Sequence, residues 1–129
     1  MTGWALPPES VPTLLLAWLA LGAAVFVALL FVAAPYGRHL RPGWGPTLPP
    51  RLGWLLMELP AVLVPSFLFA TSARTGQPVA LAFLVLWLVH YAPRAFVFPR
   101  LAAPTAARIP AVVIAMGIVF NVVNGLLQG

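Results

Sequence analysis

Four long apolar segments constrain the fold of this chain more than any other feature of its sequence. They span residues 12–34, 52–70, 79–98 and 110–127, and each is close to the roughly 20 residues that a helix needs to cross a bilayer. Of all residues, 62% are hydrophobic and only 7% are charged, which is not typical of a soluble domain. The sequence therefore predicts an all-α integral membrane protein, with residues 1–129 forming a single antiparallel bundle of four transmembrane helices.

Arginine is distributed unevenly between the two sides of this predicted bundle. Positive charge is retained on the cytoplasmic side of membrane proteins, so the distribution predicts orientation. We expect the N-terminus outside and both Arg-rich loops in the cytoplasm. Because these side chains lie at helix ends, the net charge of +5 indicates lipid phosphates as partners rather than nucleic acid. Six arginines fall on the cytoplasmic side, Arg38, Arg41, Arg51, Arg94, Arg100 and Arg108, against Arg74 alone on the other.

The remaining compositional signals concern processing and location. Segment 12–34 is too long for a signal-peptide core and has no basic residues before it, so we expect it to stay in the mature protein. The chain has no cysteine, and no second histidine or carboxylate is spaced to hold a metal with His90, so no metal site is predicted. Abundant Arg, Ala and Pro without Lys favour a GC-rich bacterial genome, and hence the bacterial cytoplasmic membrane over the endoplasmic reticulum.

Glu58 is the one acidic residue inside an apolar segment, where an ionisable group is costly and by default functional. Counted from the cytoplasmic end of its helix, it lies about 9 Å deep, and Tyr91 on the next helix lies about 10 Å deep. We therefore expect the two side chains to meet. Tyr91 belongs to an aromatic and polar face of its helix, whose members recur every three or four residues: Trp87, His90, Tyr91, Arg94 and Phe98.

This pair predicts a site for a carbonyl group. Desolvation favours the neutral form of a buried carboxyl group, so Glu58 is expected to be a hydrogen-bond donor. A neutral acid and a phenol aimed at one point would bind a ketone oxygen and stabilise negative charge growing on it. A structural Glu–Tyr hydrogen bond is the alternative. At the cytoplasmic mouth, Tyr36, Arg38 and Arg94 would bind either a lipid headgroup or a polyanionic cofactor.

The last apolar segment carries a third polar stripe. Its members recur at intervals of four, three and four residues: Gly117, Asn121, Asn124 and Gln128. On a membrane helix, such small and amide-bearing residues favour close packing and hydrogen bonds between helices.

These residues resemble the N-terminal half of the steroid 5α-reductase family, the 3-oxo-5α-steroid 4-dehydrogenases. The resemblance implies NADPH-dependent reduction of the Δ4 double bond of a 3-oxo steroid, or of a similar lipophilic enone, by an enzyme with about seven transmembrane helices. Met57 departs from the Gln of animal members, and Met116 from an Arg found in some. Four segments in the family's order carry the resemblance: APYGRH at 34–39, LGWLLMELPA at 52–61, VHYAPRAFVF at 89–98, and PAVVIAMG with NGLLQG within 110–129.

The resemblance also implies roles for individual residues. Glu58 and Tyr91 would hydrogen-bond the 3-keto oxygen while hydride goes to C5 of the substrate. The NADPH site would include Tyr36, Arg38 and Arg94. The substrate pocket would be lined by Trp54, Met57, Met116, Phe120 and Asn124.

The family takes most of its NADPH contacts from its C-terminal half, which would begin beyond Gly129. We therefore expect the missing C-terminal helices of the same enzyme to be the partner of this chain, and the 129-residue chain alone not to turn over. Two alternatives remain open. A small proton-coupled multidrug transporter would also have about four helices and one membrane glutamate, although its essential glutamate is expected in the first helix. The other is a non-catalytic membrane subunit.

Overall fold

The structure, a computed structural model, describes residues 7–35, 39–101 and 107–128. Its four long helices, each long and apolar enough to cross a membrane, confirm the predicted all-α membrane fold. Their sidedness stays a prediction. The chain divides into two compact units, residues 1–34 and 35–129. The four helices are Val11–Phe31, Pro50–Thr71, Pro78–Leu101 and Ala111–Gln128.

The first unit consists of helix α1, Val11–Phe31. Pro12 stands in its first turn, where the missing amide hydrogen removes no helical bond. The predicted span reached residue 34, but the helix ends at Phe31 because Val32 is already extended. None of its side chains is buried. Such an all-round apolar surface is typical of a helix that faces lipid.

In the second unit, the third span is one continuous rod built from three elements, α3 (Pro78–Ala92), the π-helical turn η2 (Pro93–Val97) and α4 (Phe98–Leu101). The sequence predicted its end at residue 98, so the rod is longer than expected. Within η2 the Phe98 amide donates to the Pro93 carbonyl, five residues back. This wider turn carries the rod past two prolines at positions 93 and 99.

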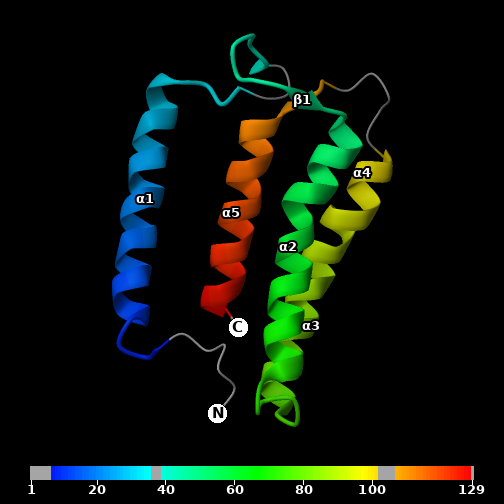
Figure 1. The fold of residues 1–129 in the computed structure, drawn as a ribbon. Coiled ribbons are helices and arrows are strands. Elements are labelled where there is room, and N and C mark those ends of the chain that lie inside the picture. The colour runs from blue at the N-terminus through cyan, green and yellow to red at the C-terminus, as the bar shows by residue number, and fades with distance from the viewer. Residues whose placement is uncertain (1–6, 36–38, 102–106, 129) are drawn as a thin grey trace. The chain divides into compact units, whose positions relative to one another are not determined.

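Two short strands tie the beginnings of α2 (Pro50–Thr71) and α5 (Ala111–Gln128) together. Strand β1, Thr47–Leu48, pairs in antiparallel fashion with β2, Ile109–Pro110. Arg108 reinforces the pair, because its Nη2 and Nε donate to the carbonyl and Oγ1 of Thr47 at 2.6 and 2.9 Å. Since both helices start from this one pair, α2 and α5 run in the same direction (Figure 1).

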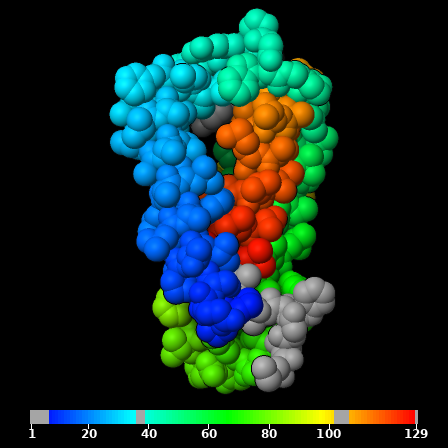
Figure 2. All heavy atoms as spheres, turned by 60° about the vertical axis from the view of Figure 1, so that its left-hand side comes forward, coloured from blue at the N-terminus to red at the C-terminus, as the bar shows by residue number. Residues whose placement is uncertain are grey.

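Helix α5 packs along α2, and glycines make the close approach possible (Figures 1 and 2). A Cβ on Gly117 would lie 2.9 Å from Cγ of Met57, and one on Gly125 would lie 3.0 Å from Cβ of Val64. Glycine at such positions lets helix backbones approach closely in a membrane, which is the packing predicted for this stripe. The core of the second unit draws on three spans and includes Ala61 of α2, Ala95 of η2 and Ile114 of α5.

Candidate functional site

Glu58 faces Arg94, not Tyr91, in this structure. Its Oε1 accepts a hydrogen bond from Arg94 Nη2 at 2.6 Å, and its Oε2 accepts one from Nε at 3.3 Å. The Glu58 side chain is 6% exposed, whereas that of Arg94 is 36% exposed. A two-point bond between a carboxyl group and a guanidinium is among the stronger side-chain hydrogen-bonded pairs in proteins. The neutral form expected for Glu58 stays a prediction.

Arg94 reaches Glu58 from the π-helical turn η2. A π turn shifts the residues that follow it around the helix axis relative to a regular α-helix, and such turns occur often at functional sites. The guanidinium carbon also lies 5.9 Å from the ring centroid of Trp54, one turn before Glu58 on α2. Arg94 therefore contacts two residues of α2, a charged one and an aromatic one.

Tyr91 lies between two aromatic neighbours on its own helix. Its ring stacks on Trp87 with the centroids 4.6 Å apart, and His90 meets it edge-on at 4.8 Å. Two hydrogen bonds connect α2 with the third span, one from Trp87 to the Ala61 carbonyl and one from Arg94 to Glu58. Tyr91 lies between Trp87 and Arg94 in sequence. The half-buried phenol is therefore held close to the Glu58–Arg94 pair.

The predicted substrate residues divide into two groups. Trp54 is half-buried beside Arg94, and Met57 is half-buried against Gly117, so both lie near the pair. Asn124 is also half-buried, on α5. Met116 and Phe120 are 58% and 51% exposed, so the described residues do not bring their side chains into one pocket with Glu58.

Asn121 is a site neighbour that was not among the predicted site residues. It is buried, 7% exposed, and its Nδ2 donates to the Met57 carbonyl at 2.7 Å. This bond fixes the backbone of α2 one residue before Glu58. The polar stripe of α5 was the available signal, and the structure bears out its interpretation as hydrogen bonding between helices.

Of the three predicted cofactor residues, Arg94 alone lies in the described part of the chain. Tyr36 and Arg38 lie outside the described residues. Arg94 is turned toward Glu58 and Trp54 rather than outward. A pyrophosphate needs several converging cations or amides, and the described residues of this set do not provide them. The NADPH site formed by these three residues stays a prediction.

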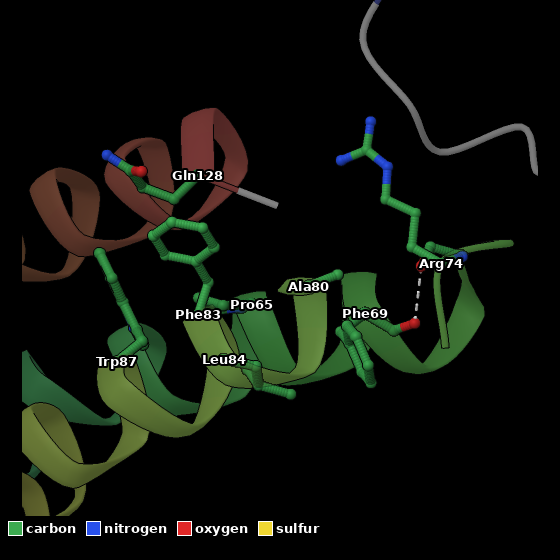
Figure 3. Close-up of a pocket in the computed structure, with 9 residues that line it drawn as sticks. Pro65, Phe69, Arg74, Ala80, Phe83, Leu84, Trp87 and Gln128 are labelled. Atoms are coloured by element: carbon green, nitrogen blue, oxygen red, sulfur yellow. Dashed lines mark hydrogen bonds between the residues drawn. The ribbon is translucent and has the colours of Figure 1, made fainter. Parts of the chain in front are cut away.

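A cavity of about 350 Å³ lies at the other end of the α2–α3 hairpin, beside the end of α5. Figure 3 shows Phe83 and Trp87 of α3 pointing toward Gln128, whereas the Arg74 side chain points away from these aromatic residues. Trp87 lines this cavity and also stacks on Tyr91, so it joins the cavity to the Glu58 region. The lining residues are Pro65, Phe69, Ser72, Arg74, Ala80, Phe83, Leu84, Trp87 and Gln128.

Comparison with known proteins gives one consistent group of relatives. The steroid 5-alpha-reductase DET2 of Gossypium hirsutum is 41% identical over 106 residues, which cover 80% of this chain and 41% of the relative. The human 3-oxo-5-alpha-steroid 4-dehydrogenase 2 is 38% identical over 119 residues, covering 84% and 45%. The human 3-oxo-5-alpha-steroid 4-dehydrogenase 1 is 32% identical over 111 residues, covering 84% and 42%.

No family model matches the chain. The matched part is less than half the length of each of these curated relatives.

Proposed function

Because the chain belongs, over the part that it covers, to the steroid 5α-reductase family, we propose that it forms the substrate side of a Δ4-3-oxo-steroid reductase. The reaction converts a C4=C5 double bond conjugated to a ketone into a single bond, with hydride added at C5 and a proton at C4. The relatives favour this function over a multidrug transporter or a non-catalytic subunit.

The observation that supports it best is the pairing of the buried Glu58 with the half-buried Arg94, close to Tyr91. As hydride reaches C5, electrons move toward the ketone, and negative charge grows on its oxygen. In this proposal the Tyr91 hydroxyl donates a hydrogen bond to that oxygen, and the guanidinium of Arg94 lies close enough to offset the charge. Glu58 is the second proposed ketone ligand. To donate a hydrogen bond to the ketone, its carboxyl group must be released from Arg94 and be protonated.

The apolar body of the substrate would extend from the ketone past Trp87 toward the cavity, whose walls are largely aromatic and aliphatic. A lipophilic steroid suits such a site, because it partitions into the bilayer and presents one ketone to anchor. NADPH is the proposed hydride donor. In this proposal it is bound mainly by parts of the enzyme outside the matched region, which is less than half the length of the relatives.

Steroid binding by the chain itself tests this function without requiring turnover. In lipid nanodiscs, radiolabelled testosterone should bind saturably, and its 3-hydroxy analogue, which lacks the ketone, should bind roughly three- to tenfold more weakly. Tyr91→Phe should reduce testosterone affinity by a similar factor and leave the 3-hydroxy analogue almost unaffected. Equal binding of the two steroids by the unaltered chain would argue against a ketone site.

A further inference from the structure

A buried backbone carbonyl on α2 lacks its usual helical partner. In a regular helix the amide of residue 65 would donate to the carbonyl of Ala61, but residue 65 is a proline and has no amide hydrogen. Ala61 is 0% exposed and Pro65 is also buried, so the carbonyl is shielded from solvent. A carbonyl in this position needs a donor from another element.

Trp87 on α3 supplies that donor. Its indole Nε1 donates to the Ala61 carbonyl at 2.7 Å, at the short end of the range for N–H···O bonds. The indole has a single polar hydrogen and no acceptor, so this bond uses its whole hydrogen-bonding capacity. The ring is thereby fixed at both ends, by its own backbone and by α2.

The same ring is the platform on which Tyr91 stacks. The two rings are 4.6 Å apart and inclined by 30°, one helical turn from each other. Tyrosine has only two side-chain torsions, so a fixed neighbour on one side and His90 on the other restrict the direction of its hydroxyl. A change that frees the Trp87 ring would therefore also free Tyr91.

We propose that Trp87 is a positioning residue for Tyr91, held in register by the Ala61 carbonyl that Pro65 leaves without a helical donor. In its functional part the proposal rests on the proposed ketone site. The structural part, a chain of contacts from Pro65 through Ala61 and Trp87 to Tyr91, is independent of any substrate.

The structural part is tested by nuclear magnetic resonance of the chain in nanodiscs. Trp87→Phe assigns the indole signal among the five tryptophans. Pro65→Ala adds an amide that competes for the Ala61 carbonyl, so the Trp87 indole signal should move upfield and exchange faster with solvent. Pro60→Ala is the matched control, because it restores a donor to Leu56 and not to Ala61. An indole signal that is equally unchanged in both variants would overturn the proposal.

The positioning of Tyr91 is tested with ring signals and steroid binding together. The chain has two tyrosines, so Tyr36→Phe isolates the ring of Tyr91. Trp87→Phe keeps an aromatic ring but removes the donor; it should shift and broaden the Tyr91 signals and weaken testosterone binding roughly three- to tenfold. In a Tyr91→Phe background it should weaken binding by a clearly smaller factor, because the effect through the hydroxyl is then absent and only the smaller apolar contact of the ring remains.

A merely structural Trp87 would weaken binding equally in both backgrounds, and that result would overturn the proposal. If the unaltered chain binds no steroid, the proposed function fails, and the Tyr91 ring signals decide alone. Signals that do not respond to Trp87→Phe would then reject the positioning role.

Discussion

At the scale of single residues, the placement of Glu58 depends on a neighbour that counting along the helix did not identify. Helix depth placed Tyr91 opposite Glu58, because depth was counted from backbone positions. Arg94 lies almost one turn further on, but its long side chain and the π turn bring its guanidinium to the carboxylate. The sequence predicted that the ionisable side chain of Glu58 would have a polar partner on the neighbouring helix. It did not predict which of two polar residues on one helix face would be that partner.

Removal of one member of this pair should cost more than removal of both. Arg94→Met leaves the buried carboxylate unpaired and should lower the free energy of unfolding by roughly 1–4 kcal/mol, between the values typical of exposed and buried pairs. Glu58→Leu combined with Arg94→Met should regain most of that loss. Reversible unfolding in mixed detergent micelles measures both.

Arg100→Met is the control for this experiment, because Arg100 is exposed on the same rod and, among the described residues, donates to the Phe96 carbonyl of its own helix. It should change stability by less than about 0.5 kcal/mol. A double variant as unstable as Arg94→Met alone would contradict the assignment of the pair.

At the scale of elements, the spans were predictable because length and hydropathy decide what crosses a bilayer. The strands β1 and β2 were not, since two-residue strands have no periodicity to detect. The π turn was also beyond the sequence, because Pro93 and Pro99 indicate an interruption but not its form. The sequence predicted that the glycine-containing face of α5 packs closely against another helix. That this helix is α2 came only from the structure.

Close packing at the α2–α5 seam predicts that Gly→Ala changes differ in their effect on stability according to position. Helix propensity alone would predict that both changes stabilise the chain. Gly125→Ala should destabilise the chain by about 1–3 kcal/mol, because the added methyl group would meet Cβ of Val64 and Cδ of Pro65 at 3.0 and 3.2 Å. Gly22→Ala in α1 meets nothing within 4 Å and should be neutral or slightly stabilising. Unfolding curves of the two variants check the order. A Gly125→Ala variant as stable as Gly22→Ala would contradict close packing at this seam.

At the scale of the whole molecule, the family was predictable from four short segments, two of which contain Glu58 and Tyr91. The relatives are more than twice as long as the matched part, so the complete reaction belongs to a larger molecule in our proposal. The cofactor site could not be derived, since Tyr36 and Arg38 lie outside the described residues. Orientation likewise depends on arginine counts alone.

Orientation can be measured directly because the chain contains no cysteine. Thr75→Cys, in the loop between α2 and α3, should react with a membrane-impermeant maleimide added to intact cells. Pro42→Cys, in the Arg-rich loop before α2, should react only after the membrane is opened. The reverse pattern would place the Arg-rich loops outside and contradict the predicted topology.

Turnover distinguishes a half-enzyme from a complete one. The 129-residue chain, supplied with NADPH and testosterone in nanodiscs, should give no 5α-reduced product even where it binds the steroid. Chromatography of the extracted steroids checks this. Product formed at a rate proportional to the chain would contradict the proposal that the cofactor-binding part lies elsewhere.

The hydrogen bonds between α2 and the third span also affect how the chain is inserted into a membrane during synthesis. Each charged residue at the centre of a span opposes insertion by about 2.5–3.5 kcal/mol, and a helix with an unmatched carbonyl adds to that. Glu58 with Arg94, and Ala61 with Trp87, cancel these costs only when both helices are present. The short turn between them, residues 72–77, keeps them adjacent as they emerge from the ribosome. We expect the translocon to release α2 and α3 into lipid as one hairpin.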